Sequence, residues 1–549
     1  MTYKYQTNIS TKNTPQSQAI FGRENEMKKN RAGGYVFKVN EWTMLDRFLI
    51  LGSERNTYYA TAKQLTTDNA QNVVSLIKKD GKAVVDRVIE ISDAGRAPKN
   101  DPALFVLAMA AGLGDTQTKN YALANLSKVA RIGTHLFTFV DYVTAFRGWG
   151  RALRNGISNW YLLKDVDDLA YQVVKYQSRE KWSHRDLLRL SHTHPADDLK
   201  NLLFAWVVNG IGREVTDKDG NVIKRFPHMI DDVKSLKTVY GFELAKRATN
   251  EDEIVKLIKE YNLVRETIPT QFMGKKVYEA LLPTMPMTAL IRNLGNLSKC
   301  GLLVKGATDV INLVAEKLTN ETALHKARVH PITILNALMT YKSGHGFKGS
   351  GEWEVVGRII DALDEAFYKA FTAVVPTGKR FLLAVDISGS MGCANVIGLQ
   401  SLMARDAAAV MAMVTARVEK NYDVVGFSNH LIDLKITPRQ RLDDVIREMG
   451  RYPFGGTDCS LPMYWAADNK REFDVFMVFT DNETWAGRRG HPVQALQEYR
   501  QKTGIPAKMI VTAFTATDVS IADPNDGGML DIAGFDSAAP EIIHNFIIE

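Results

Sequence analysis

The chain has 549 residues, too many for one hydrophobic core, so its length predicts three or four domain-sized units, or fewer if a repeat array is present. Its three cysteines, Cys300, Cys393 and Cys459, have no paired spacing, which argues against a disulfide-bonded secreted protein. No stretch approaches eighteen uncharged apolar residues and the amino terminus lacks an apolar core, so we expect a cytoplasmic protein without a membrane segment.

The net charge of +7 is divided unevenly along the chain. Residues 381–549 carry 15 Lys and Arg against 22 Asp and Glu, a net charge of −7, which leaves 54 against 40, or +14, for residues 1–380. A basic amino-terminal part indicates contact with a polyanion, and nucleic acid is the first candidate. A solvated surface of mixed charge is the alternative.

Residues 1–30 are polar, and we expect them to form a flexible arm. The domain predicted over residues 31–375 is helical, because apolar residues recur at three and four positions along it. Many short helices joined by brief turns are typical of stacked pairs such as HEAT repeats. The polar stretch Gly210–Lys224 is predicted to be a turn or hairpin that projects from the array. The predicted helices are Asn69–Lys79, Lys82–Ile91, Ala103–Gly112, Thr118–Arg131, Trp149–Leu162, Val166–Gln177, Ser183–Ser191, Leu199–Val208, Glu251–Tyr261, Lys276–Leu282, Met287–Leu294, Asp309–Leu318, Pro331–Tyr341 and Val355–Ala373.

Basic residues gather most densely between positions 175 and 194. Lys175 and Arg179 are one helical turn apart, and Arg185, Arg189 and His192 stand at i, i+4 and i+7 on one helical face. We interpret this face as a surface for RNA phosphates.

Two kinds of apolar residue accompany the basic face. Leu187, Leu188 and Leu190 are expected to pack inward, while Trp182 or Tyr176 is available to stack on a base. A basic solvent-exposed face with Trp182 in the core explains the same pattern equally well.

The apolar run that begins at Phe381 ends on Asp386, followed by Ser388 and Ser390. Such a run suits a strand buried on both faces, and ligands of open α/β sheets bind beyond the carboxyl ends of these strands. Oxygen donors without His or Cys favour a hard cation such as Mg²⁺.

Two later segments supply further oxygen donors, Thr457 after a glycine-rich turn and Asp481 after another apolar run. Strands and helices alternate here, which predicts a parallel, doubly wound sheet. The Asp-x-Ser-x-Ser, Thr, Asp pattern resembles the metal-ion-dependent adhesion site of von Willebrand factor A domains. By that resemblance Ser388, Ser390 and Thr457 touch the ion, and Asp386 and Asp481 hold it directly or through water. The elements predicted after the first strand are helices near 396–419 and 440–449, strands at 421–428, 473–480 and 507–514, and helices at 460–469, 491–503 and 539–548.

An enzymatic role finds little support in the sequence. Ser390 is not on a Gly-x-Ser-x-Gly elbow, His491 stands alone before Pro492, and no phosphate-binding Gly-x-x-x-x-Gly-Lys motif occurs. We therefore expect a binding protein, and a metal-dependent hydrolase remains the alternative.

A basic helical array followed by an adhesion-type domain resembles the Ro autoantigen family, whose members carry a TROVE domain. The match runs from about residue 33 to the carboxyl terminus, and it departs from animal members in residues 1–30, between Phe139 and Trp149 and at Gly210–Lys224, which favours a bacterial or phage-like relative. The segments that carry it are Glu41–Leu49, Arg131–Phe139, Trp149–Arg154, Trp182–His192, Pro376–Asp386 and Phe479–Thr484.

The resemblance implies a ring of helical repeats, the TROVE domain at 31–375, joined to a von Willebrand factor A domain at 376–549. It also implies a monomer that binds Y-like noncoding RNA outside the ring and single-stranded 3′ ends of misfolded RNA in its central hole. Lys175, Arg179 and His192 match family positions for Y RNA, whereas Arg185 and Arg189 are added from the helical face. The alternative is an adhesion module in which Mg²⁺ recruits a partner such as an exoribonuclease.

Overall fold

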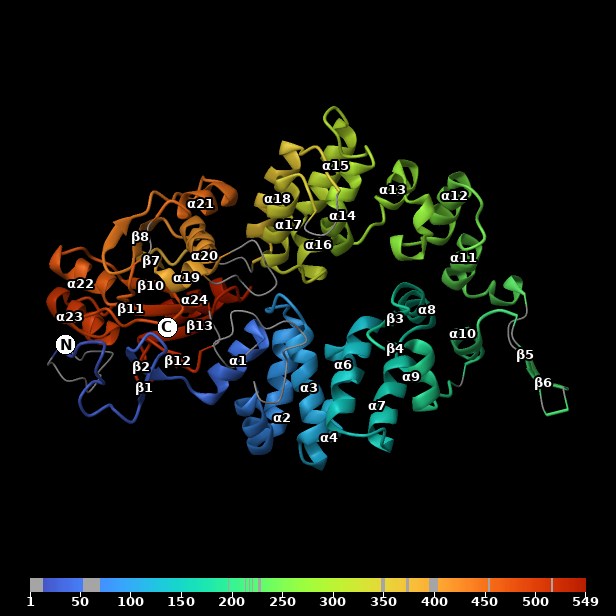
Figure 1. Ribbon diagram of the computed structural model, residues 1–549, viewed down its shortest axis with the longest axis horizontal. Coiled ribbons are helices and arrows are strands. Elements are labelled where there is room, and N and C mark those ends of the chain that lie inside the picture. The colour runs from blue at the N-terminus through green and yellow to red at the C-terminus, as the bar shows by residue number, and fades with distance from the viewer. Residues whose placement is uncertain are drawn as a thin grey trace.

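The computed structural model describes residues 13–52, 70–195, 197–212, 214–216, 218–219, 221–225, 229–346, 351–371, 375–393, 403–452, 455–514 and 517–549. Helical pairs run around a ring from α1 (Glu41–Leu51) to α18 (Gly357–Lys369), and an α/β domain occupies one end of that ring (Figure 1). This arrangement confirms the predicted combination of a helical repeat ring with a doubly wound domain.

The helices between these two have the following bounds. They are α2 (Gln71–Asp93), α3 (Asp101–Leu113), α4 (Thr116–Ala124), α5 (Leu126–Val129), α6 (Gly133–Phe146), α7 (Arg151–Leu162), α8 (Val166–Lys175), α9 (His184–Ser191), α10 (Asp198–Asn209), α11 (Lys237–Ala245), α12 (Glu251–Tyr261), α13 (Lys275–Leu281), α14 (Met287–Lys299), α15 (Thr308–Leu318), α16 (Glu321–Lys326) and α17 (Pro331–Ser343). Two hairpins interrupt them, β3 (Ser178–Arg179) with β4 (Trp182–Ser183) and β5 (Glu214–Thr216) with β6 (Val222–Arg225). The second hairpin projects from the ring, as the polar stretch there predicted (Figure 1).

Most ring helices follow the apolar periodicity that predicts them. In α7, for example, Leu153, Ile157, Trp160 and Tyr161 are buried at i, i+4, i+7 and i+8. The two helices predicted at 69–79 and 82–91 merge into α2, which has a non-helical residue, Asp80, where the prediction places the break.

The ring helices α1, α6, α11 and α16 are absent from the sequence prediction. The segment Gly133–Phe146 buries Phe137, Phe139, Val140 and Val143. A short run rich in aromatic and β-branched residues fits a buried strand as well as a buried helix, so its type is decided by packing.

The carboxyl-terminal domain contains a six-stranded sheet in the order β13-β11-β10-β7-β8-β9, in which only β9 is antiparallel to its neighbour. The predicted strands are present, and β9 and β13 are additional. The bounds are β7 (Arg380–Asp386), β8 (Asn421–Phe427), β9 (Leu431–Asp433), β10 (Val475–Thr480), β11 (Lys508–Ala513) and β13 (Met529–Ala533), with helices α19 (Gly389–Cys393), α20 (Ala404–Val418), α21 (Leu442–Met449), α22 (Leu461–Asp468), α23 (Pro492–Thr503) and α24 (Ala539–Ile548). Part of the helix predicted near 396–419 lies outside the described residues.

Residues 13–38 pack against the carboxyl-terminal domain. The strands β1 (Met27–Lys29) and β2 (Tyr35–Lys38) form an antiparallel sheet with β12 (Val519–Ser520). Gln16 is fully buried, and its amide donates to Asp458 at 2.8 Å. The described part of the expected flexible arm is therefore held by the domain, because its polar residues find hydrogen-bond partners there that sequence composition does not reveal.

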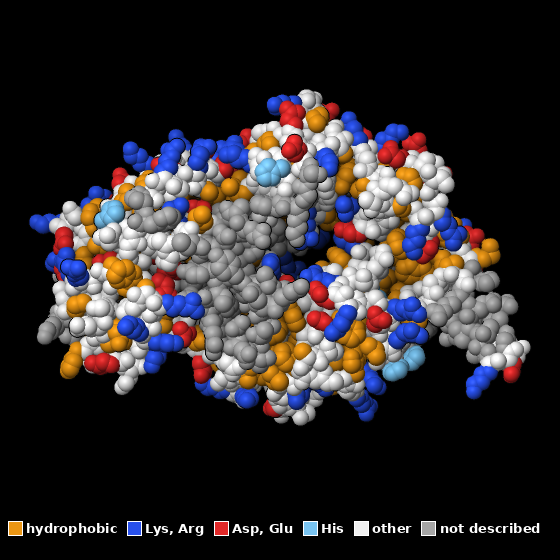
Figure 2. Space-filling view, viewed as in Figure 1, with side chains coloured by type: hydrophobic (Ala, Val, Ile, Leu, Met, Phe, Trp, Pro, Cys, Tyr) orange, Lys and Arg blue, Asp and Glu red, His pale blue; other side chains and the backbone are white. Residues whose placement is uncertain are grey.

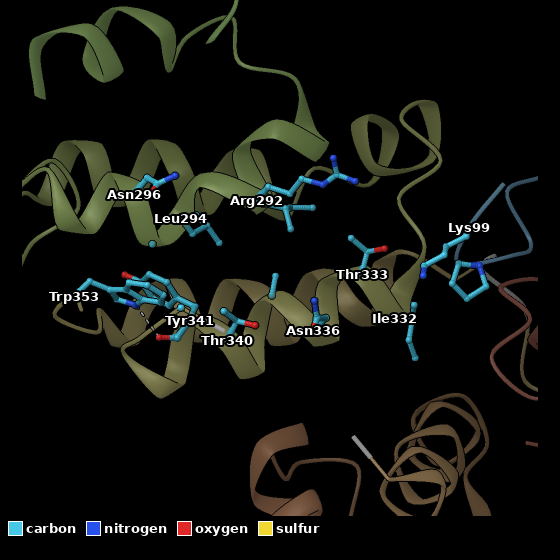
Figure 3. A pocket seen from close by; sticks show the side chains of 15 residues that line it. Lys99, Arg292, Leu294, Asn296, Ile332, Thr333, Asn336, Thr340, Tyr341 and Trp353 are labelled. Atoms are coloured by element: carbon cyan, nitrogen blue, oxygen red, sulfur yellow. Dashed lines mark hydrogen bonds between the residues drawn. The ribbon is translucent and has the colours of Figure 1, made fainter. Parts of the chain in front are cut away.

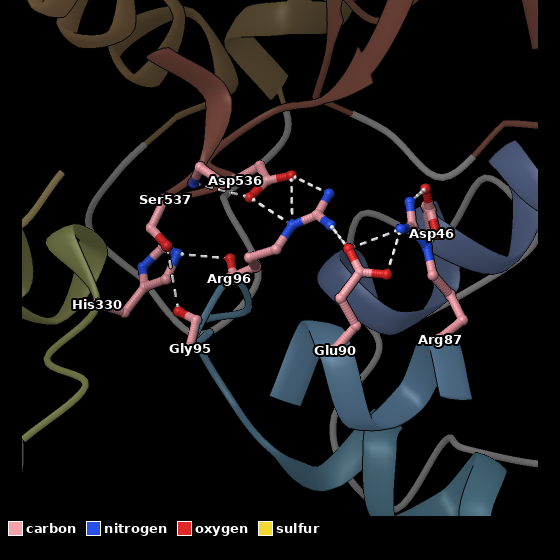
Figure 4. Close-up of polar contacts among 9 residues, drawn as sticks. Asp46, Arg87, Glu90, Gly95, Arg96, His330, Asp536 and Ser537 are labelled. Carbon is pink, nitrogen blue, oxygen red and sulfur yellow. Dashed lines mark hydrogen bonds and ion pairs between the residues drawn. The ribbon is translucent and has the colours of Figure 1, made fainter. Parts of the chain in front are cut away.

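The two arcs of the ring and the α/β domain meet at one junction, which we call the seam and define by Asp93–Arg96, Arg328–His330 and Asp536. Figure 4 shows Arg96, His330 and Asp536 there. Buried Arg96 pairs with Asp536 at 2.7 Å, and Arg328 pairs with Asp93 at 2.6 Å. The ring of His330 donates from Nε2 to the carbonyl oxygen of Arg96 at 3.1 Å. These long-range contacts close the ring.

The two arcs of the ring differ in how their hydrophobic cores relate to the α/β domain. Buried residues from Leu45 to Phe242 form one cluster, whereas those from Ala245 to Phe371 are continuous with the α/β domain. Helix α18 of the second arc is also bonded to the α/β domain, since Asp364 accepts from the backbone N–H of Leu442 at 2.9 Å. The second arc and the domain therefore share one core.

Within the described ranges, no helix is both long and apolar enough to span a bilayer.

Candidate nucleic-acid interface and metal centre

The basic face predicted between positions 175 and 194 is built from α8, the β3–β4 hairpin and α9. Lys175 ends α8, where its ammonium donates to the Tyr171 hydroxyl at 2.8 Å and lies over the Tyr176 ring. Arg179 is exposed on β3, with Asp101 3.9 Å away. At that distance the pairing with Asp101 is weak, so the guanidinium is available to a phosphate.

Helix α9 begins with a capping box in which Ser183 and Asp186 satisfy each other's backbone N–H groups. The face of this helix that points to solvent carries Arg185 and Arg189, and His192 ends the helix with a left-handed backbone, φ 53°. Within the described part of the chain these three side chains have no ion-pair partner. An unpaired cationic face of this kind is suited to phosphate contacts.

The apolar residues of this segment divide differently from the prediction. Leu187 and Leu188 are buried, but Leu190 is 38% exposed and does not pack inward. Trp182 is half-buried against Trp149, with ring centroids 5.9 Å apart, and its indole N–H donates to Asp141. Leu190 lies two positions after Leu188, about 200° around the helix, and so falls on the solvent side, because α9 buries only one face.

Between the two arcs the molecular surface is hollowed, and several Lys and Arg side chains lie in and beside this hole, with some Asp and Glu side chains at its edge (Figure 2). Near the seam, Lys99 and Arg292 line a cavity of about 500 Å³. Neither residue was singled out from the sequence. They lie almost two hundred positions apart and have no shared local pattern, so only ring closure brings them together.

The predicted metal donors meet at the carboxyl ends of β7 and β10. Ser388 donates from its backbone N–H to Asp386 Oδ1 at 2.8 Å, and the hydroxyl oxygens of Ser388 and Ser390 lie 3.1 Å apart. The other oxygen of Asp386 accepts from the Thr480 hydroxyl at 2.7 Å. The first three predicted donors therefore form one cluster.

Thr457 and Asp481 come to the same strand ends by separate routes. The strands β7 and β10 pair in parallel with Val385 opposite Phe479, so Asp386 and Asp481 leave the same edge of the sheet. The loop that contains Thr457 is joined to the serine segment by a hydrogen bond from Gly389 N–H to the Gly455 carbonyl, 3.2 Å.

Burial makes this cluster electrostatically unusual. Both Asp386 and Asp481 are fully buried, and desolvation, with the Asp481 charge second, raises the pKa of Asp386 to about 7. Two buried like charges are costly unless a cation or proton compensates them. An all-oxygen set with two carboxylates and three hydroxyls thus fits a hard divalent cation.

A contact that the sequence did not suggest connects this cluster to the amino-terminal segment. The amide of Asn30 donates to the carbonyl oxygens of Asn482 and Thr484, and the backbone N–H of Ala32 donates to Glu483. These residues directly follow Asp481. Gly34 has to be glycine here, since a Cβ would lie 1.9 Å from the Thr484 carbonyl oxygen.

The ring and the domain correspond to two known families. The TROVE domain family matches residues 28–379, and the Ro60 von Willebrand factor A family matches residues 380–547. The chain belongs to the Ro60 family. The resemblance stated from the sequence is thereby confirmed.

Relatives of the Ro60 family match nearly the whole chain. The RNA-binding protein RO60 of Deinococcus radiodurans is 39% identical over 539 residues, which cover 98% of both chains. The protein of the same name from Caenorhabditis elegans is 38% identical and covers 94% of this chain and 90% of its own. The crystal structure of the Deinococcus radiodurans RO (RSR) protein superposes with a TM-score of 0.70 and covers 92% of this chain and 99% of that one.

Proposed function

We propose that this chain is a non-catalytic RNA-binding protein that holds single-stranded 3′ ends of misfolded noncoding RNA in its central hole and Y-like RNA on its outer surface. The observation that carries this proposal is a closed ring with cationic side chains around the hole (Figure 2). Two relatives carry the name RNA-binding protein RO60, which supports the proposal.

Closure of the ring determines which RNA can enter. A strand can pass through a closed hole only by threading a free end, and an unpaired strand is narrower than a duplex. Lys and Arg around the hole attract phosphates of any sequence. The ring would therefore select RNA for an unpaired tail, which is a property of misfolded or incompletely processed transcripts, without reading sequence.

The outer site is proposed to consist of Lys175, Arg179, Arg185, Arg189 and His192. The last four are exposed and Lys175 is half-buried beside them, and their positions on neighbouring elements suit the phosphates of a folded RNA. We further propose that the protein acts as a cytoplasmic monomer, in keeping with the free thiols of Cys300 and Cys459 in a reducing compartment.

The proposal is tested by comparing three RNAs with one shared stem-loop. One has a single-stranded 3′ tail, one is blunt, and one has the same tail ended by a second, larger stem-loop. In a gel shift at fixed salt we expect tight binding of the first RNA only, because the second stem blocks threading. Equal binding of the first and third RNAs would show that no threading occurs.

A second function is proposed for the carboxyl-terminal domain. We propose that Asp386, Ser388, Ser390, Thr457 and Asp481 hold Mg²⁺ or a similar cation and that a partner carboxylate, for example on an exoribonuclease, binds at this site. A bound cation would supply an open coordination position for that carboxylate. The chain's own residues supply the oxygen ligands and keep them buried.

The metal site is tested by thermal unfolding with increasing MgCl₂. A ligand present at a hundred times its Kd stabilises the folded protein by about 2.7 kcal/mol. We expect Ser388→Ala to remove most of that response, while Ser191→Ala, at a buried serine of the ring, retains it. The tailed-RNA affinity of Ser388→Ala should equal that of the unchanged protein. An identical Mg²⁺ response in both variants would remove Ser388 from the site.

A further inference from the structure

The cavity near the seam lies where the two arcs of the ring meet. Helices α14 and α17 of the second arc form its long walls, and Lys99, from the connection between α2 and α3 in the first arc, bounds one end (Figure 3). Its volume of about 500 Å³ falls within the range of about 300–1,000 Å³ that is typical of small-ligand sites.

One end of the cavity is cationic. The Arg292 guanidinium extends toward the Lys99 end (Figure 3). Neither side chain has a hydrogen bond or ion pair with any described residue, and none of the residues that line the cavity is acidic. Lys99 and Arg292 are both solvent-exposed and give this end of the cavity a positive potential, which favours an anionic ligand group such as a phosphate.

The middle of the cavity carries polar groups without partners. The hydroxyl of Thr340 is buried and has no hydrogen bond, and the Asn336 side chain has none within the part of the chain that the structure describes. An unsatisfied buried hydroxyl reduces stability, so a valine here would fold at least as well. A ligand that enters the cavity can supply the hydrogen bonds that these two side chains lack.

The opposite end is aromatic. Tyr341 and Trp353 are stacked with centroids 6.2 Å apart, and the indole N–H of Trp353 donates to the Tyr341 carbonyl oxygen at 3.0 Å. The α14 residue below Trp353 is Gly295, where a Cβ would come within 2.8 Å of the indole ring. The glycine lets the aromatic pair approach the helix and form a flat wall of the cavity.

We propose that this cavity binds one nucleotide turned out of the RNA strand that passes the hole, a subsite that rests on the function proposed above. Lys99 and Arg292 hold the phosphate, Asn336 and Thr340 bond the edge of the base, and Trp353 faces its ring. A free mononucleotide has the same chemistry, so the experiment separates the two sources.

The test is an abasic scan of the single-stranded tail. Tailed RNAs that lack the base at one position each are titrated against the full-length protein. Loss of one stacked and hydrogen-bonded base costs roughly tenfold in affinity. We expect that loss at one position, and we expect Thr340→Val and Asn336→Ala to abolish the dependence on that base without lowering Tm. Asn155→Ala, at an exposed asparagine of α7, is the matched control, and we expect it to retain the dependence on that base.

The outcomes separate the two proposals. If the protein prefers tailed RNA but no position of the tail responds to base removal, the subsite is wrong and the threading function stands. If the tail itself makes no difference, both fail. AMP and UMP are added as competitors. If either one binds the cavity but the dependence of tail affinity on that base is unchanged, the cavity serves free nucleotides and its assignment to the RNA strand is overturned. Arg292→Ala should weaken all tails and lower the salt dependence.

Discussion

At the scale of single residues, the proposed outer RNA site depends on charges that the fold leaves unpaired. Many of the arginines that the structure describes form ion pairs, as Arg23 does with Asp523 and Arg500 with Asp526. Arg185 and Arg189 have no such partner among the described residues, and Arg179 has a distant one. Side chains that fold stability does not use are the ones available to bind RNA.

Charge reversal tests this directly for the outer site. We expect Lys175→Glu with Arg179→Glu to weaken binding of a Y-like stem-loop RNA by about 1 kcal/mol or more per lost phosphate contact. The salt dependence should fall in parallel, since fewer counterions are released. Filter binding at several salt concentrations measures both quantities. Lys420→Glu, an exposed lysine of the acidic domain, is the control, and equal loss in both variants would contradict the placement.

At the scale of elements, single buried side chains attach helices of the ring to the α/β domain. Helix α1 contacts β13, and its Arg47, 1% exposed, donates to Asp531 at 2.6 Å and to the Val519 carbonyl oxygen at 3.0 Å. This ion pair positions α1 where the ring leaves the domain. The exposed pair of Lys28 and Asp518 joins the amino-terminal segment to the same domain.

These two ion pairs make a matched comparison. Arg47→Met leaves the largely buried Asp531 carboxylate with only the Ser520 hydroxyl as a partner, and we expect a loss of about 3 kcal/mol in the free energy of unfolding. Lys28→Met removes a solvent-exposed pair and should cost less than about 1 kcal/mol. Urea titration followed by tryptophan fluorescence measures both. Similar shifts of the two urea midpoints would mean that α1 is not held through Arg47.

At the scale of the whole molecule, the seam decides whether the ring is closed. His330 is buried there, and desolvation lowers its pKa to about 4. Its Nδ1 accepts from the Ile332 N–H at 3.1 Å while its Nε2 donates to Arg96. Both nitrogens are therefore committed in the neutral form, and protonation would place an N–H against the Ile332 N–H.

The depressed pKa of His330 predicts the direction of a pH effect on the seam. The unfolded chain binds this proton near pH 6.5 and the folded chain near pH 4. The contribution of His330 to the free energy of unfolding is therefore complete above pH 6.5 and is lost as the pH falls toward 4. The loss is on the order of 3 kcal/mol. Between pH 7.5 and 4.5, the free energy of unfolding should change less with pH for His330→Gln than for the unchanged protein. His135 and His184, whose pKa values burial also lowers, remain in both proteins, so the difference isolates His330.

The sequence alone was sufficient for features that depend on local pattern. Apolar periodicity identified most ring helices, and strand-end oxygens located Asp386, Ser388 and Asp481, because a residue's distance from a strand end is encoded within a few positions. Packing decided the rest. Leu190 faces solvent, α6 is a helix, and Gln16 is buried because contacts with distant segments are more favourable than the local alternatives. Closure at Arg96, Asp536 and His330, and the cavity between Lys99 and Arg292, exist only where segments hundreds of residues apart meet, and no local pattern encodes that meeting.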